Sequence, residues 1–318
     1  MTGRTYPADP ADAALRLFRR WFGGHYARTT VVESMESQDS TLTGVVTVGR
    51  RWRVSFTVVN TLAPDADLAF EAARAALEQR LDSEGRSLAL WVPRGAQLPT
   101  GEPGLSQVVL SVQSANQLED GRLEVRRPAN IYLRRTSTQG SVVTILGGLA
   151  AHWAQFTNRV PGSFQLQAQE LYRLPASEEE RELLTERIVL ASQQPEADDS
   201  QLLTTEDVWT ANDLEDGGSC VLGTPIPEND EWSSSLRRNL RLALRAAKGF
   251  DAGAVDARAL IVLGAADYAE EEKLTLALRG MDPGLYAGYD LISVIADGVV
   301  KPLLQPARQT LPWDAPLG

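Results

Sequence analysis

Residues 41–59 read TLTGVVTVGRRWRVSFTVV and contain two β-rich runs separated by a turn. Thr41–Val48 and Trp52–Val59 are dominated by β-branched and aromatic residues, which favour strands. Gly49-Arg50 lies between the runs and is short enough to join antiparallel neighbours. The stretch therefore predicts a β-hairpin, and the elements on either side of it decide which sheet the hairpin joins.

Helical patterns flank this hairpin. Residues 11–22 place large apolar residues at helical spacing before Gly23-Gly24, and residues 65–81 repeat the pattern ahead of an apolar strand at 88–92. In the second helix the expected buried stripe is Phe70, Ala73, Leu77 and Leu81, and the residues expected outside it are Glu71, Arg74 and Glu78. The order α, β, β, α, β predicts a mixed sheet with helices packed against it.

The centre of the chain consists of short apolar runs between turn residues. We expect strands at 107–112, 123–127 and 131–134, with Asp120-Gly121 as the strongest turn. The apolar residues of 142–157 fall on one stripe, which predicts a helix packed on a core.

The second half of the chain alternates helices and strands. Ser177 and Glu180 form a capping box for a helix at 178–192, and residues 204–209 fit one turn of helix. The expected C-terminal elements are a helix at 232–248, a strand at 259–263, a helix at 268–279, a strand at 291–295 and, after the turn Asp297-Gly298, a strand at 299–304. Alternating strands and helices favour a parallel strand pair.

These elements predict an α/β (mixed α+β) chain with mixed sheets, flanking helices and two or three packed modules, as its 318 residues allow. The predicted organisation is an N-terminal αββαβ module (1–94), a central basic strand-and-helix module (105–192), an acidic loop-rich linker (193–231) and a C-terminal αβαβ module (232–318).

Charge is distributed unevenly along the chain. Between Arg187 and Arg237 there are eleven acidic and no basic residues, which equals the whole net charge of −11. Residues 121–174 instead carry seven arginines against Glu124 and Glu170. The total charge therefore does not exclude an anionic partner. The acidic stretch either solubilises the chain or folds over the arginines and competes with that partner.

A candidate anion site lies at 134–141. Arg134 and Arg135 precede a polar loop, and Ser141 is a suitable N-cap for the predicted helix at 142–157. The unpaired amides of a helix N-terminus and two arginines favour an anion, although an ordinary capped helix explains the pattern as well. Arg126 and Arg127 extend the basic surface of this module.

The predicted helix at 232–248 carries a second basic surface. Its five cations, Arg237, Arg238, Arg241, Arg245 and Lys248, lie opposite the apolar residues Leu236, Leu240, Ala243, Leu244 and Ala247. Such a face can follow a phosphate backbone. It can equally be a solvated face balanced by the acidic residues that precede the helix.

The α-β-β-α-β order of the first module resembles part of the core of restriction-endonuclease-like nucleases. That family carries an acidic residue ahead of E-x-K on the next strand. Asp39 precedes the first strand here, but Val54-Ser55-Phe56-Thr57-Val58 has neither carboxylate nor lysine. The resemblance therefore implies a non-catalytic, binding or scaffolding version.

No motif in the chain identifies a reaction or a cofactor, so we expect no cofactor and no catalytic residues. A zinc site would need His25, His152 and Cys220 together with a carboxylate, and we expect no metal. The chain lacks a long apolar run and a signal-peptide pattern, which predicts a soluble, cytoplasmic protein with no membrane partner.

The sequence as a whole favours a non-catalytic binding or scaffold protein of a multi-component assembly. A protein is the first expected partner and the phosphates of nucleic acid are the second. Only three of the 31 basic residues are lysines, a bias that indicates a bacterial source. The alternative is a nuclease-like or phosphohydrolase enzyme with the 134–141 loop as its anion site and Asp39 or Glu124 as metal ligand.

Overall fold

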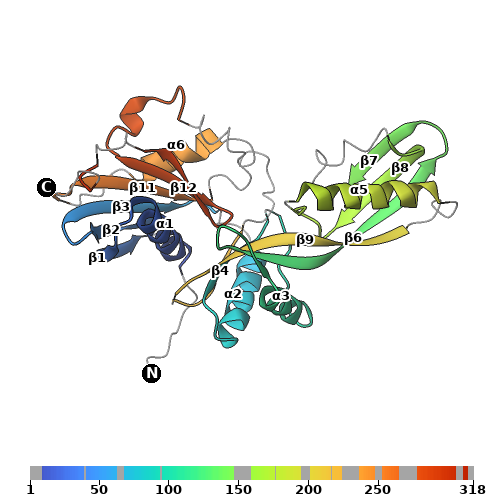
Figure 1. Cartoon of the computed structure of the whole chain (residues 1–318), viewed down its shortest axis with the longest axis horizontal. Helices are drawn as coiled ribbons and strands as arrows, with labels where there is room; N and C mark the ends of the chain where they lie inside the picture. Colours follow the sequence, from blue (N-terminus) through green and yellow to red (C-terminus); the bar gives the residue numbers. More distant parts are fainter. Residues whose placement is uncertain are drawn as a thin grey trace. The chain divides into compact units, whose positions relative to one another are not determined.

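The computed structural model describes the chain in separate stretches. They are residues 9–38, 41–62, 68–93, 95–146, 159–175, 177–194, 201–215, 217–223, 236–247, 253–264, 278–305 and 311–313. The chain divides into two compact units, of which unit 1 comprises residues 1–92 and 212–318 and unit 2 comprises residues 93–211. Both α/β units contain mixed sheets with flanking helices, which confirms the predicted fold class (Figure 1).

Unit 1 is built on a six-stranded sheet in the order β1-β2-β3-β11-β12-β13. Its strands are β1 (Thr30–Gln38), β2 (Thr41–Val48), β3 (Trp52–Asn60), β11 (Ala257–Leu263), β12 (Leu291–Ala296) and β13 (Val299–Leu304). The first three form an antiparallel meander, which confirms the hairpin at Gly49-Arg50. β11 pairs in parallel with β3 and β12, and β13 is antiparallel to β12, so the predicted parallel pair is also confirmed.

The predicted modules 1–94 and 232–318 therefore share one sheet. The contact between β3 and β11 continues beyond the strands, because Arg53 Nη1 donates to the carbonyl of Ala254 at 2.9 Å and the Arg53 amide to Asp256 at 2.8 Å. Local patterns predicted β3 and β11 correctly, but neither pattern shows that these two strands, about two hundred residues apart, pair with each other.

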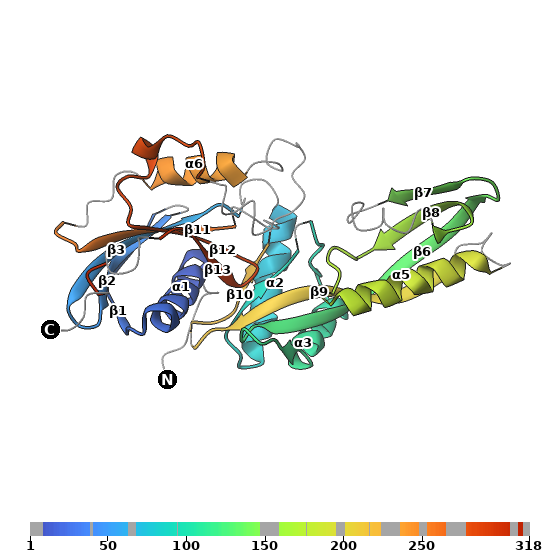
Figure 2. The ribbon, with the colours of Figure 1, turned by 45° about the horizontal axis from the view of Figure 1, so that its top comes forward.

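A helix covers each face of this sheet (Figure 2). α1 (Pro10–Tyr26) is capped by Asp9, whose carboxylate accepts the amide of Ala11 at 2.9 Å, and packs Leu15, Phe18 and Phe22 onto one face. α6 (Leu236–Ala246) packs Leu240, Ala243 and Leu244 onto the other. Both apolar stripes lie where helical spacing placed them.

The edge strand β1 was not predicted from the sequence. Glu33–Gln38 are exposed on both faces, so the strand has no apolar alternation to reveal it. A bulge interrupts its pairing with β2 between Val32 and Ser34. Gly44 makes the bulge fit, because a Cβ there would lie 2.1 Å from the carbonyl oxygen of Ser34.

Unit 1 also contains α2 (Leu68–Ser83), β4 (Leu88–Trp91) and β10 (Cys220–Leu222), with β10 parallel to β4. The predicted stripe of α2 is buried as expected. Glu78 is buried with it, which corrects the prediction that this side chain lies outside. A short 3-10 helix, η4 (Pro283–Leu285), precedes β12, and the predicted helix at 268–279 lies largely outside the described residues.

Unit 2 is built around the long strand β6 (Leu123–Ser137), which replaces the two strands predicted at 123–127 and 131–134. Its other elements are α3 (Gly104–Gln113), β5 (Asn116–Gln117), β7 (Ser141–Leu146), β8 (Gly162–Gln169), α5 (Glu178–Gln193) and β9 (Gln201–Asp213), whose last two residues belong to unit 1. β6 is antiparallel to β5, β8 and β9, and β7 is parallel to β8.

The core of unit 2 lies between α5 and the sheet. Leu184 and Ile188 of α5 pack with Ile131, Leu133 and Leu166 of the strands. The capping box is confirmed on its N-cap side, because Ser177 Oγ accepts the amide of Glu180 at 3.3 Å. Pro128 falls where β6 pairs with β9 and where β8 has not yet begun on the other side of β6.

Three sequence-based predictions in unit 2 are wrong. Residues 107–112 lie in α3, where Val108, Val109 and Val112 are buried at helical spacing despite their β preference. Residues 141–146 form β7, because their β-branched side chains suit the parallel pairing with β8, and the rest of the helix predicted at 142–157 lies outside the described residues. Residues 204–209 lie in β9.

Candidate functional site

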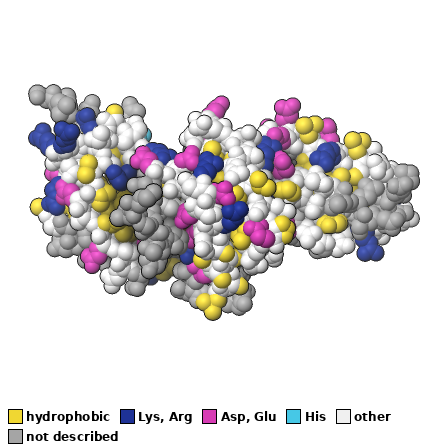
Figure 3. Space-filling view, turned by 90° about the horizontal axis from the view of Figure 1, so that it is seen from below, with side chains coloured by type: hydrophobic (Ala, Val, Ile, Leu, Met, Phe, Trp, Pro, Cys, Tyr) yellow, Lys and Arg dark blue, Asp and Glu magenta, His cyan; other side chains and the backbone are white. Residues whose placement is uncertain are grey.

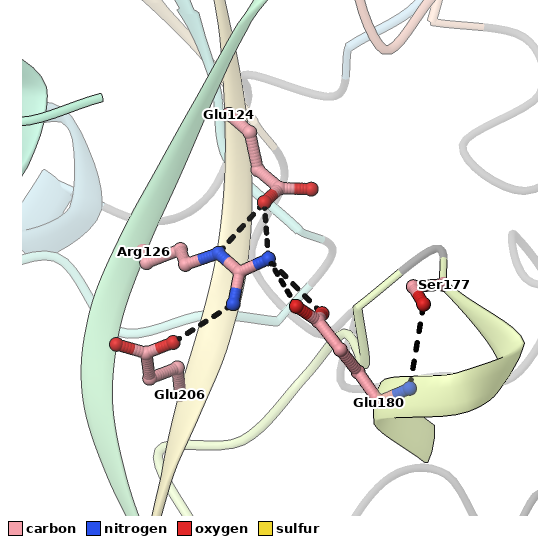
Figure 4. Close-up of polar contacts among 5 residues, drawn as sticks. All are labelled: Glu124, Arg126, Ser177, Glu180 and Glu206. Carbon is pink, nitrogen blue, oxygen red and sulfur yellow. Dashed lines mark hydrogen bonds and ion pairs between the residues drawn. The ribbon is translucent and has the colours of Figure 1, made fainter. Parts of the chain in front are cut away.

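The structure places the predicted arginines in different surroundings, and Arg126 and Arg127 of β6 are more enclosed than the others. Arg126 is held by three carboxylates (Figure 4). Its Nε donates to Glu124 at 2.7 Å, its Nη1 to Glu206 at 3.1 Å and its Nη2 to both oxygens of Glu180 at 3.0 Å. Burial disfavours the guanidinium charge, but these hydrogen bonds outweigh burial and raise the pKa of Arg126. Its donors are therefore used within the fold.

Arg127 points to the opposite face of β6, as strand alternation requires. Its Cζ lies 4.1 Å from the centroid of the Trp209 ring, at stacking distance. Asp207 is its direct partner in the β6–β9 register and attracts its charge. Burial lowers the pKa of Arg127, and the Asp207 and Glu170 charges oppose that shift.

Asp207 is the best satisfied buried charge of the described chain in unit 2. Its Oδ1 accepts the amides of Tyr172 and Arg173 and its Oδ2 accepts Trp209 Nε1, each at 2.7 Å. Its side chain is fully buried. Burial raises its pKa while the three hydrogen bonds oppose that change. The carboxylate ties a loop, a strand and an indole together, so it is a structural group.

The acidic stretch is thus partly a strand and not a loop throughout. β9 places Glu206 and Asp207 against Arg126 and Arg127 in a regular ladder with β6. Deleting 196–216 would remove this strand, so such a deletion tests folding before it tests competition with a partner. Glu196, Asp198 and Asp199 lie outside the described residues.

The anion site predicted at 134–141 depended on a helix N-terminus and on two arginines, and the structure has no helix beginning at Ser141. Ser141 begins β7 and pairs with Gly162, so the helix N-terminus that supplied free amides is absent from these residues. Arg135 Nη2 donates to the carbonyl of Ser192 at 2.7 Å, and its guanidinium lies over Phe164. Arg134 is exposed and makes no hydrogen bond or ion pair with the described part of the chain.

Only one of the two metal ligands suggested for the enzyme alternative lies among the described residues. Glu124 is largely buried and bonded to Arg126, and Asp39 lies outside the described residues. The arginines and Ser141 remain predictions as binding residues. On the face drawn in Figure 3, basic and acidic side chains are interspersed over much of the described surface.

The α6 arginines have different surroundings. Arg241 and Arg245 are exposed, lie one helical turn apart and make no hydrogen bond or ion pair with any residue that the structure describes. Leu242 lies between them and is 43% exposed. Lys248 and the side chains of Arg237 and Arg238 lie outside the described residues.

Sequence reasoning missed a buried charged group in unit 1, on α2. Glu78 is fully buried, and its Oε1 accepts the amide of Val221 in β10 at 2.9 Å and Arg74 Nη1 at 3.4 Å. Its Oε2 is buried and has no hydrogen-bond partner among the described residues. Burial raises the pKa of Glu78 to about 7, against the opposing effects of the Val221 amide and Arg74.

The segment before β10 is held by the next turn of α2. Asp82 accepts the amide of Ser219, whose Oγ donates to the carbonyl of Arg86 at 3.0 Å. The buried Cys220 follows, and burial raises the pKa of its thiol well above the ordinary value, with the Glu78 charge adding to the rise. Glu78 and Asp82 are four residues apart, which is the only trace of this arrangement in the sequence.

Comparison with known proteins gives no further identification of the site. No family model matches the chain, and neither the curated proteins nor the solved structures contain a significant match. None of the helices in the described ranges is long and apolar enough to cross a membrane. The resemblance to nucleases accordingly stays a prediction.

Proposed function

We propose that the chain is a non-catalytic binding or scaffold protein of a multi-component assembly that contacts the phosphates of nucleic acid through the exposed arginines of α6. The observation that carries this proposal is the absence of a partner for Arg241 and Arg245 in the part of the chain that the structure describes. An arginine whose donors face water can bind a phosphate without breaking an internal contact.

The packing of α6 supports the same choice. Leu240, Ala243, Leu244 and Ala247 are buried against the sheet, so the helix is fixed and the direction of its outer face is fixed with it. Arginines four residues apart on a fixed helix keep a constant spacing, which reduces the entropy lost when a polyanion binds. Arg126 on β6 lacks this advantage, because it would have to leave three glutamates first.

A salt titration of nucleic-acid binding tests the proposal. We expect the Arg241→Ala/Arg245→Ala variant to bind DNA or RNA oligonucleotides about tenfold more weakly than the wild type at low salt. The slope of log K against log salt should fall by about 1.8 for duplex DNA, because each phosphate contact contributes about 0.9. Fluorescence anisotropy from about 50 to 300 mM salt measures both quantities.

The matched control is Arg122→Ala/Arg159→Ala. It removes the same two charges, but from arginines that are paired with Asp120 and Glu182 at 2.7 Å. We expect this variant to bind nearly as the wild type does. Equal loss in both variants would assign binding to net charge alone, and no loss in the α6 variant would contradict the proposal.

A further inference from the structure

The segment 217–222 is attached to α2 by two carboxylates of different character. Asp82 is partly exposed and accepts the amide of Ser219 next to solvent. Glu78, one turn earlier, accepts the amide of Val221 in the core, where its second oxygen has no donor among the residues that the structure describes. Water can stabilise the charge on the first carboxylate and cannot reach the second.

The charges around Glu78 do not neutralise it fully. On α2 the nearby charged groups are Arg74, Glu71 and Asp82; β10 presents Cys220; and Asp9 and Asp12 at the start of α1 face the same thiol. Arg74 is the one cation among them, and its Nη2 also bonds Glu71 at 2.6 Å. An ionised Glu78 is thus a buried anion that shares its cation with another carboxylate.

We propose that Glu78 is a proton-operated latch: when it is protonated, β10 stays docked on α2, and when it ionises, β10 opens locally and exposes Cys220. An ionised carboxylate with one free buried oxygen gains hydration by moving to water, and that movement breaks its bond to the Val221 amide. β10 is short, with three residues paired to β4, so few other bonds oppose the opening.

The chain before β10 is built to turn. Gly217 and Gly218 have φ values of +104° and +82°, which glycine adopts without strain. A Cβ at Gly217 would lie 2.9 Å from the Arg16 guanidinium, and one at Gly218 would lie 3.1 Å from Asp82. The two glycines therefore form a hinge, while Asp82 keeps the segment anchored to α2 during opening.

Cys220 supplies the measurement, because it is the only cysteine of the chain and is fully buried. The full-length protein is reacted with dipyridyl disulfide at several pH values. The protection factor at each pH is the labelling rate of the denatured chain divided by the labelling rate of the folded chain. This protection factor should fall roughly tenfold per pH unit between about pH 5 and pH 7 and then level off, as proton linkage to one group requires.

Three variants make the result specific. Glu78→Gln keeps an acceptor for Val221 and removes the titration, so its protection should not change with pH. Glu84→Gln removes an exposed carboxylate that is paired with Arg80 and should behave as the wild type does. Arg74→Gln removes the cation beside Glu78, so the pH at which protection levels off should rise.

Several outcomes would overturn the latch. They are a wild-type protection factor that does not change with pH, a Glu78→Gln variant with the wild-type profile, or an Arg74→Gln variant with an unshifted profile. Protection equal to the global unfolding constant from urea denaturation would also overturn it, because Cys220 would then react only in the unfolded chain. Protection that is weaker than this constant and depends on pH through Glu78 supports local opening.

Discussion

Charged side chains have opposite surroundings in two regions of the molecule. One region is the contact between β6 and β9 in unit 2, and the other comprises α2 and α6 in unit 1. In unit 2, Arg126 has three carboxylates and Asp207 has three donors. In unit 1, neither the buried Oε2 of Glu78 nor the guanidinium of Arg241 has a hydrogen-bond partner among the described residues. The first set of charges holds a fold together, and the second has hydrogen-bonding groups that no described residue uses.

This difference teaches that a count of arginines is a poor guide to an anion-binding surface. The central module has a formal excess of five positive charges between residues 121 and 174. Glu180 and Glu206, both outside that range, contact Arg126, and Asp207 faces Arg127. The local excess is thus compensated by neighbouring elements, whereas α6 keeps exposed arginines whose donors have no described acceptor.

The largest effect is expected from Asp207→Ala. The substitution leaves the amides of Tyr172 and Arg173 and the indole of Trp209 without an acceptor in a buried position. Leaving several buried donors unpaired should lower the free energy of unfolding by about 4 kcal/mol. Urea denaturation followed by tryptophan fluorescence measures the loss.

Asp207→Asn separates the hydrogen bonds from the charge. Its amide oxygen can still accept the two backbone amides, so the variant should recover about half of the loss. If the free energy of unfolding of Asp207→Ala lies within about 1 kcal/mol of the wild-type value, the carboxylate is not a structural group and the contrast between the two regions fails.

The next effect concerns Glu78→Gln and depends on pH. Burial raises the pKa of Glu78 from 4.5 to about 7, so the folded chain binds a proton that the unfolded chain has already released in that interval. The stability contributed by protonated Glu78 is complete below about pH 4.5 and is lost as the pH rises through about 7. Each unit of pKa difference corresponds to about 1.4 kcal/mol.

We therefore expect the stability of Glu78→Gln relative to the wild type to increase by at most about 3 kcal/mol between pH 4 and pH 8. Urea denaturation at intervals of one pH unit gives the curve, with Glu84→Gln as the control for an exposed carboxylate. A constant difference between Glu78→Gln and the wild type across this range would mean that Glu78 has the same pKa in the folded and unfolded chains.

Arg126→Gln should have a smaller effect, a loss of about 1 to 2 kcal/mol, because its network is only partly buried. Three glutamates without their cation repel one another, so the loss should decrease in 0.5 M salt. The comparison variant is Arg159→Gln, whose single ion pair with Glu182 is more exposed and should contribute less than about 0.5 kcal/mol. Equal losses in the two variants would mean that the Arg126 network adds nothing to an ordinary surface pair.

Much of unit 1 could be predicted from local patterns. The hairpin at 41–59, the helices beside it and the parallel strands 259–263 and 291–295 depend on periodicity and turn chemistry, which sequence carries directly. Failures occurred where two structures share one pattern. Residues 107–112 and 142–146 are both rich in valine, yet the first segment lies in a helix and the second in a strand, so local composition does not decide between the two.

The surroundings of the charges were less predictable, because they depend on contacts between distant segments. Arg126 meets Glu206 across 80 residues, and Glu78 meets Val221 across 143. Glu78 was expected outside the buried stripe of its helix, together with Glu71 and Arg74, but its side chain is buried and bonded to Val221 of β10. The basic face of α6 was predictable, since the described cations and the buried residues all belong to one helix.

The smallest change in stability is expected from Arg241→Ala/Arg245→Ala. Removing two unpaired, exposed cations breaks no described contact and relieves repulsion between residues four apart, worth a few tenths of a kcal/mol. Arg245 lies in the last turn of α6, where a cation suits the helix dipole by a similar amount, so the two terms nearly cancel. Urea denaturation should show a difference below about 0.5 kcal/mol. A larger loss would mean that these arginines stabilise the fold as Arg126 does, and any weaker nucleic-acid binding by the variant would then reflect partial unfolding.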